Sequence, residues 1–199
     1  MVKKLLLSIV LSVALPGFAR AQGFGHLVPA EPSVGQRAGA PALDRWTPPL
    51  PTPGERRAAE IASNVTVYTL LALDVVDAFR SEHRTRALVL TGVRVGATQG
   101  ASFGLKKLFS RRRPCSYGLS GSPEVHGYNY AESCGSDDPD YSMPSGHSAT
   151  AWSTLGGPRL AITVPLSVST QGLRVAAGKH WLTDTLVGAG IGLATSRIR

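Results

Sequence analysis

The sequence has little cysteine, little acid and no long hydrophobic run without charge, and each shortage narrows the possible classes of protein. Its two cysteines, Cys115 and Cys134, are too few to form a metal site, and no histidine lies at ligand spacing from either. No stretch of about 18 residues is both apolar and uncharged, so a soluble or peripheral domain is favoured over one with a clear membrane span. The 199 residues allow one domain with a sizeable core.

The 13 acidic residues are outnumbered by 21 lysines and arginines, which gives a formal charge of +8. Most of the basic residues are arginine, whose planar fork of donors suits phosphate. A basic chain can equally bind nucleic acid or an anionic membrane surface. Composition alone therefore does not choose among these partners.

The N-terminus has the order of a secretory signal peptide. Lys3 and Lys4 precede an apolar run over residues 5–15, and Ala19-Arg20-Ala21 has the small-x-small pattern of a cleavage site. We expect residues 1–21 to be removed before Gln22, which lowers the formal charge to +5; the alternative is an uncleaved anchor. The sequence thus predicts export to the periplasm or cell envelope. In that oxidising compartment a Cys115–Cys134 disulfide is expected.

The exported part divides into regions that differ in composition. Residues 22–54 are rich in proline and glycine and are expected to form a poorly ordered leader. From residue 55 to 199, apolar residues at helical spacing predict one helical domain. We expect helices over residues 55–79, 85–112, 145–155, 160–177 and 181–196, with a long loop over 114–144. The predicted fold class is all-α.

Two motifs flank the long loop. The first runs from Lys106 to Pro114, and the spacing of Lys106 and Arg113 would put both on one face of a continuing helix. A basic cluster at a helix C-terminus is also common without any function. The second is Pro144-Ser145-Gly146-His147, where a helix N-terminus after a glycine predicts an anion site.

The third motif contains Arg174, His180 and Asp184. On a helix, a carboxylate four residues after an imidazole can hold one ring nitrogen and leave the other free to attack or to take a proton. A lone pair at this spacing is usually a surface pair, so the order of all three motifs matters more than any one of them.

Together, Lys-x6-Arg-Pro, Pro-Ser-Gly-His and Arg-x5-His-x3-Asp resemble the three-part signature of the type 2 phosphatidic acid phosphatase family. That family shares its fold with bacterial class A acid phosphatases and vanadium haloperoxidases, and the resemblance covers about residues 85–196. It implies an all-α helical bundle that hydrolyses a lipid-linked or small-molecule phosphomonoester or diphosphate through a phosphohistidine intermediate. It implies no metal, no other cofactor and no nucleic-acid partner, with peripheral membrane contact open.

The resemblance also assigns roles. His180 would be the nucleophile, Asp184 would orient it, and His147 would protonate the leaving oxygen and then activate water. The phosphate oxygens would be held by Lys106, Arg113, Ser145, Gly146 and Arg174.

The sequence departs from the family pattern at two points. Leu173 replaces the usual serine, and the interval from His147 to Arg174 is short for membrane-embedded members with six spanning helices.

Two other functions stay open: a vanadium-dependent haloperoxidase, against which the short chain argues, and a non-catalytic envelope protein that binds anionic lipid. His126 and the acidic residues Asp137, Asp138 and Asp140 of the long loop are expected to be solvated. The alternatives are that His126 reaches the substrate and that the acidic residues screen the basic site or select leaving groups.

Overall fold

The computed structural model describes residues 44, 53–117, 134, 137–138, 140–156 and 159–198. The predicted signal peptide over 1–21 lies outside the described residues, as does most of the predicted leader over 22–54 and His126.

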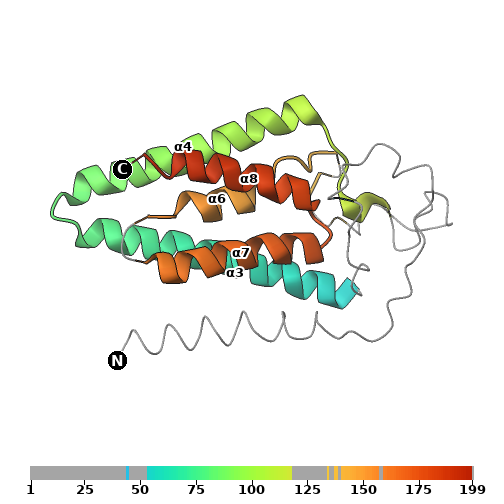
Figure 1. The fold of residues 1–199 in the computed structure, drawn as a ribbon, viewed down its shortest axis with the longest axis horizontal. Coiled ribbons are helices and arrows are strands. Elements are labelled where there is room, and N and C mark those ends of the chain that lie inside the picture. The colour runs from blue at the N-terminus through green and yellow to red at the C-terminus, as the bar shows by residue number, and fades with distance from the viewer. Residues whose placement is uncertain are drawn as a thin grey trace.

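The described residues form a helical bundle, which confirms the predicted all-α class. Its α-helices are α3 (Pro53–Arg80), α4 (Arg84–Phe109), α6 (Gly146–Ser153), α7 (Leu160–Ala176) and α8 (Leu182–Thr195), with a short 3-10 helix, η1 (Pro114–Tyr117). The short helix α6 lies at the centre, with α4 and α8 on one side and α3 and α7 on the other (Figure 1), and it packs against all four.

Two glycines let α8 approach α6 closely. A Cβ added at Gly188 would lie 2.4 Å from the carbonyl oxygen of Ser145, and one at Gly192 would lie 2.3 Å from that of Ala149. Gly190, on the other side of α8, has open space around it. The glycine pair therefore sets how closely α8 packs against α6, and both helices carry predicted site residues.

The interior of the bundle is small and polar. Among the described residues, the apolar cluster is formed by Val67, Leu70, Ala151 and Leu166, with Leu71 and Ile162 packed against it. Buried hydroxyls join the helices instead: Thr66 bonds Thr170 at 2.8 Å between α3 and α7, and Thr98 bonds Thr195 at 2.7 Å between α4 and α8. The helices thus associate largely through close packing of small residues and interhelical hydrogen bonds, which is typical of helices that pack within membranes.

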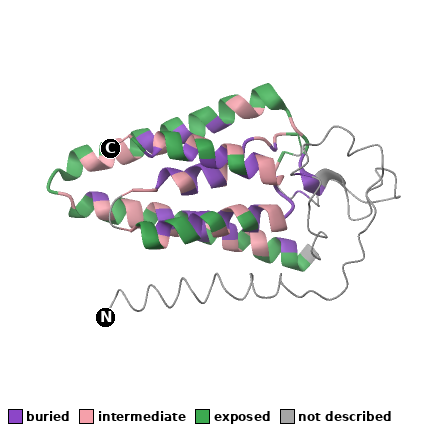
Figure 2. Ribbon diagram, viewed as in Figure 1, coloured by how far each residue is buried: buried purple, intermediate pink, exposed green. Residues whose placement is uncertain are grey.

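Large apolar side chains lie on the outside of the bundle, where Figure 2 shows exposed residues along the outer helix faces. The exposed members on the two long helices include Ile61, Val65, Tyr68, Val75, Val76, Phe79, Val89, Val93, Phe103, Leu108 and Phe109. Leu160, Val164 and Val168 of α7 and Leu186 and Leu193 of α8 are also exposed. We call this set the apolar belt.

One described helix, α3 over Gly54–Arg80, is long and apolar enough to cross a membrane, with a mean hydropathy of 1.3 over its best window. Two acidic residues, Asp74 and Asp77, interrupt its apolar run. Both carboxylates are paired in the structure, Asp74 with Arg94 and Asp77 with Arg159 at 2.6 Å. Ion pairing lowers the cost of an acidic side chain in apolar surroundings.

The predicted end of the second helix was wrong. Helix α4 ends at Phe109 instead of continuing to residue 112, because Ser110 adopts a left-handed conformation (φ 39°) and its N–H donates to the carbonyl oxygen of Lys106. Arg113 therefore follows the helix on an irregular segment and does not share a helical face with Lys106. The two side chains are still close enough for the charge of Arg113 to lower the pKa of Lys106.

Candidate active site

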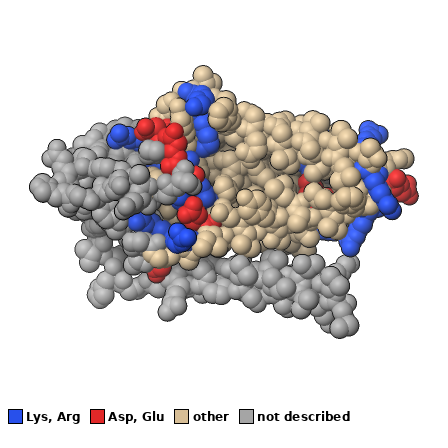
Figure 3. Space-filling model, turned by 180° about the vertical axis from the view of Figure 1, so that it is seen from behind, with Lys and Arg blue, Asp and Glu red and all other residues tan. Residues whose placement is uncertain are grey.

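The predicted site residues gather at one end of the bundle. They come from the end of α4 and the segment after it, the start of α6, the end of α7 and the turn before α8. Figure 3 shows Lys, Arg, Asp and Glu concentrated towards the two ends of one face, with a broad surface of other residues between them.

His180 is buried in this end, with 2% of its surface exposed. Its Nε2 lies 3.3 Å from Nη1 of Arg113, and its Nδ1 lies 3.8 Å from Oδ2 of Asp184. Burial holds the pKa of His180 well below its usual value, and the nearby charges of Arg174 and Arg113 lower it further. The imidazole is therefore neutral at physiological pH, which is the form that can act as a nucleophile.

Asp184 is fully buried in the first turn of α8. Its carboxylate accepts hydrogen bonds from Nη1 of Arg111 at 2.8 Å, from the backbone N–H of Trp181 at 2.8 Å and from the Ser142 hydroxyl. The 3.8 Å separation from His180 is longer than a hydrogen bond. In the free protein Asp184 thus faces Nδ1 as a fixed negative charge.

Arg111 pairs with both Asp184 and Asp44, and neither Arg111 nor Asp44 was among the predicted site residues. Arg111 also donates to Thr183 Oγ1 at 2.7 Å and pairs with Asp44, whose side chain is fully buried. Asp44 in turn accepts from the backbone N–H of Thr183 at 3.0 Å. A residue of the predicted leader thus holds the turn that carries the site, and no local pattern around residue 44 signals this contact.

The three predicted phosphate-binding cations converge although their segments are far apart in sequence. Lys106 Nζ donates to the carbonyl oxygen of Tyr141 at 2.8 Å, and Arg113 Nη1 donates to that of Lys179 at 2.8 Å. Burial and the nearby charge of Arg113 lower the pKa of Lys106 to about 8. Burial lowers the pKa of Arg174 to about 10, opposed by Asp137. Crowded, desolvated cations of this kind form a strong anion site.

The Pro-Ser-Gly-His segment forms the start of α6 at the same end of the bundle. Ser145 caps α6, as predicted, and its side chain accepts from the N–H of Ser148 at 3.4 Å. Its own N–H donates to the carbonyl oxygen of Asp184 at 2.9 Å, so this N–H is engaged in packing α6 against α8. Of the cradle donors expected here, the Ser145 hydroxyl and the Gly146 N–H stay predictions.

His147 lies in the first turn of α6, half-buried, with Nε2 2.8 Å from Oδ1 of Asn64 on α3. Because an amide oxygen only accepts, this bond places a proton on Nε2. Burial, aided by the charge of Arg174, lowers the pKa of His147 to about 3. His147 is therefore neutral in the free protein, and an incoming anion would favour its protonation.

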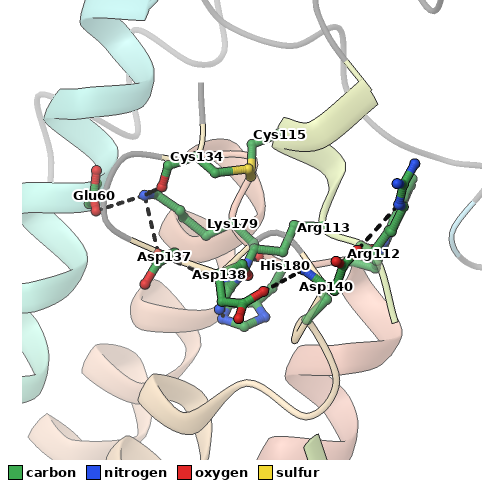
Figure 4. Close-up of a disulfide and its surroundings, with 12 residues drawn as sticks. Glu60, Arg112, Arg113, Cys115, Cys134, Asp137, Asp138, Asp140, Lys179 and His180 are labelled. Atoms are coloured by element: carbon green, nitrogen blue, oxygen red, sulfur yellow. Dashed lines mark hydrogen bonds and ion pairs between the residues drawn. A yellow bond between two sulfur atoms is a disulfide. The ribbon is translucent and has the colours of Figure 1, made fainter. Parts of the chain in front are cut away.

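A disulfide joins Cys115 to Cys134 beside the cations (Figure 4). Close by, Asp137 extends its carboxylate among basic side chains instead of lying in solvent, so the expectation of a solvated side chain was wrong for this residue. Lys179, which the sequence analysis did not select, has a buried side chain that contacts Asp137, Glu60 and the Cys134 carbonyl oxygen. Asp138 and Asp140 are exposed, as expected.

Among the described residues, no group of three or more His, Cys, Asp and Glu side chains could hold a metal ion. Comparison with known proteins gives one match: the family model of the PAP2 superfamily covers residues 87–199. That range includes all three motifs and both cysteines, whereas Asp44, Glu60 and Asn64 precede it. No curated protein and no solved structure matches the chain.

Proposed function

The chain belongs to the PAP2 superfamily, which implies phosphatase-type activity on a phosphorylated substrate, and from this premise we propose a specific reaction. The protein is a metal-independent phosphoric ester hydrolase that forms a phosphohistidine on His180. The observation that carries the proposal is the neutral, buried imidazole of His180, whose Nε2 lies 3.3 Å from the Arg113 guanidinium and whose surroundings include the charges of Arg174 and Lys106.

In the first step, the phosphoryl oxygens bind Lys106, Arg113 and Arg174, which offset their negative charge. Nε2 of His180 attacks phosphorus, forming a P–N bond as the bond to the leaving oxygen breaks. The leaving oxygen takes a proton from His147. The fixed charge of Asp184, 3.8 Å from Nδ1, stabilises the cationic phosphohistidine.

In the second step, water replaces the departed alcohol or phosphate. His147 takes a proton from the water, whose oxygen attacks phosphorus and breaks the P–N bond, releasing phosphate and neutral His180. Because the pKa of His147 is about 3 in the free protein, its protonated form depends on the dianionic substrate. We therefore expect proton delivery to be coupled to substrate binding.

We propose a lipid-linked phosphate as the substrate class, with the protein associated with the membrane of the cell envelope. The support is the reversed polarity of the bundle: hydroxyls and glycines lie between the helices, whereas the apolar belt faces outwards. An exposed apolar surface of this extent marks a contact with membrane or protein. The site lies at one end of the bundle, where a headgroup could meet the cations while its chains lie along the belt.

The test is phosphate release from a lipid phosphate in detergent micelles and from a soluble aryl phosphate, both in EDTA. The full-length protein and His83→Ala should turn over, because His83 is exposed in the turn between α3 and α4, at the other end of the bundle. His180→Ala should show no turnover, and vanadate should inhibit the active forms. Activity that disappears in EDTA and returns with zinc or magnesium would contradict the metal-free reaction.

A further inference from the structure

Asp137 occupies the place where the proposed reaction needs a phosphoryl group. Its Oδ2 lies 3.5 Å from Nη2 of Arg174 and 3.9 Å from Nη1 of Arg113, two of the three predicted phosphate-binding cations. The same Nη1 of Arg113 lies 3.3 Å from the attacking nitrogen of His180. A carboxylate oxygen is thus held by the groups that would hold a phosphoryl oxygen.

Lys179 is a fourth cation at this position. Its side chain is 4% exposed, and Nζ lies 3.2 Å from Oδ2 of Asp137, 2.9 Å from Oε1 of Glu60 and 2.6 Å from the carbonyl oxygen of Cys134 (Figure 4). It precedes His180 directly, at one of the unspecified positions of the Arg-x5-His-x3-Asp motif. The motif therefore does not explain why a lysine is buried here.

The cations around Asp137 favour an anion between them whether or not substrate is bound. Burial alone would raise the pKa of Asp137, but Arg113, Lys179 and Arg174 outweigh it and lower the pKa to about 2. The carboxylate is therefore charged at any physiological pH. A dianionic phosphoryl group cannot share the same donors, because two anions so close together would repel each other strongly. Substrate binding therefore requires Asp137 to leave.

We propose that Asp137 is an internal stand-in for the substrate phosphoryl group, and that Lys179 is a fourth phosphate ligand, released to the substrate when Asp137 withdraws. The inference rests on the proposed function, because it takes the cation cluster as the substrate site. Asp137 leaves when the higher charge of a phosphomonoester or diphosphate outcompetes its single charge, so weakly charged phosphodiesters are selected against.

The backbone beside Asp137 is anchored, so withdrawal concerns its side chain. Cys134, three residues earlier, is tied to Cys115 by the disulfide, and its carbonyl oxygen accepts from the N–H of Asp137 at 3.3 Å. Lys179 keeps its bonds to Glu60 and to the Cys134 carbonyl when Asp137 moves. Its ammonium group thus stays in place to meet the incoming phosphoryl oxygen.

The experiment measures the Kd of inorganic phosphate for the full-length protein by calorimetry, which needs no turnover. Asp137→Asn should bind phosphate about tenfold more tightly, because a competing state is removed. Asp140→Asn is the matched control: it removes the same charge from the same loop, but Asp140 is exposed and pairs only peripherally with Arg112 at 3.2 Å. Its Kd should not change. Unchanged or weaker binding in Asp137→Asn would overturn the stand-in role.

The role of Lys179 is tested in the Asp137→Asn background, where its ammonium has lost one competing partner. Adding Lys179→Gln should weaken phosphate binding about tenfold, the value of one charge-assisted hydrogen bond. If that variant does not fold, Lys179→Arg serves, because a larger planar head group must also shift the Kd. An unchanged Kd in the folded variant would remove Lys179 from the phosphate contacts.

These binding results are separate from the proposed function. If Asp137→Asn tightens phosphate binding while the wild-type protein hydrolyses no phosphoester, the stand-in role holds and the hydrolase proposal fails. If hydrolysis depends on His180 but the Kd of Asp137→Asn equals that of wild type, the hydrolase proposal holds and the stand-in role fails.

Discussion

The candidate site has two halves that are built in different ways. One half is presented by helix ends: His147 on α6, Arg174 on α7 and Asp184 on α8, set by glycine-mediated packing of α8 against α6. The other half is presented by irregular segments: Arg113, Asp137 and their neighbours, held by ion pairs and a disulfide. The helix half is positioned by backbone packing, whereas the loop half is positioned by charged side chains.

This difference predicts which substitutions should damage each half of the site. A helix end moves only if the packing of the helices changes, so the helix half should be damaged mainly by substitutions that push one helix away from another. A loop held by buried charges depends on each partner, because an orphaned buried charge costs far more than a lost surface contact. The two halves should therefore respond differently to matched substitutions.

The largest effect is expected for Arg111→Ala. Arg111 pairs with two fully buried carboxylates, Asp184 and Asp44, and removing it leaves both without that cation. Loss of one partner of a buried pair typically costs about 3–5 kcal/mol of unfolding free energy. The next residue, Arg112, is the control, because its side chain is 64% exposed. Denaturant titration should show a large loss for Arg111→Ala and little for Arg112→Ala; equal losses would contradict the loop account.

The disulfide is the second way to weaken the loop half. Protein exported to the periplasm should yield peptides linked through Cys115 and Cys134 in mass spectrometry. The double variant Cys115→Ser/Cys134→Ser should lose about 3 kcal/mol, as expected for a crosslink closing a loop of this length. Its helical content by circular dichroism should be unchanged. Two freely alkylated thiols in the exported protein would contradict this prediction.

Glycine substitutions test the helix half. A Cβ at Gly188 would meet the Ser145 carbonyl oxygen at 2.4 Å, so Gly188→Ala forces α8 away from α6. We expect a loss of about 1–3 kcal/mol from overpacking, together with lower activity. Gly190→Ala has open space around its Cβ and should be neutral or raise stability by up to about 1 kcal/mol through helix propensity. Similar effects of the two variants would rule out close packing as the cause.

The smallest effect concerns pH. His147 has a pKa near 3 in the folded protein and about 6.5 when unfolded, so between these values only the unfolded state binds the proton. Its contribution to stability is therefore complete above pH 6.5 and falls by up to about 1.4 kcal/mol per pH unit below it. Unfolding titrations from pH 7 to 5 should show a shallower decline for His147→Asn than for wild type. Parallel curves would mean that His147 is not held neutral.

The sequence predicted the helix half well because its signals are local. A capping serine marks the start of α6. His180 precedes α8 and is not part of a helix with Asp184, but its Nδ1 still faces the Asp184 carboxylate at 3.8 Å. The loop half was less accessible, because its contacts join residues far apart in the chain. Asp44 reaches Thr183, and Asp137 reaches Arg174, through partners that no spacing rule connects.

The apolar belt shows a second limit of the sequence. Hydropathy averaged along a helix does not tell which side chains face outwards, and α3 carries two acidic residues that pairing neutralises. The three-dimensional arrangement shows that many large apolar residues lie outside, whereas many hydroxyls lie inside. The helix packing therefore supports membrane association, which the sequence alone left open.

The central claim is that His180 is the nucleophile and His147 the proton donor. Rapid-quench labelling with a ³²P aryl phosphate tests it most directly, because an aryl leaving group hardly needs protonation. Loss of the general acid typically lowers the rate about 10²–10⁴-fold for poor leaving groups. An aryl phosphate should escape most of this loss, and His147→Ala should therefore still complete the first step with it. An acid-labile phosphoenzyme should accumulate in His147→Ala and be absent in His180→Ala. Labelling that survives the loss of His180 would contradict the assignment.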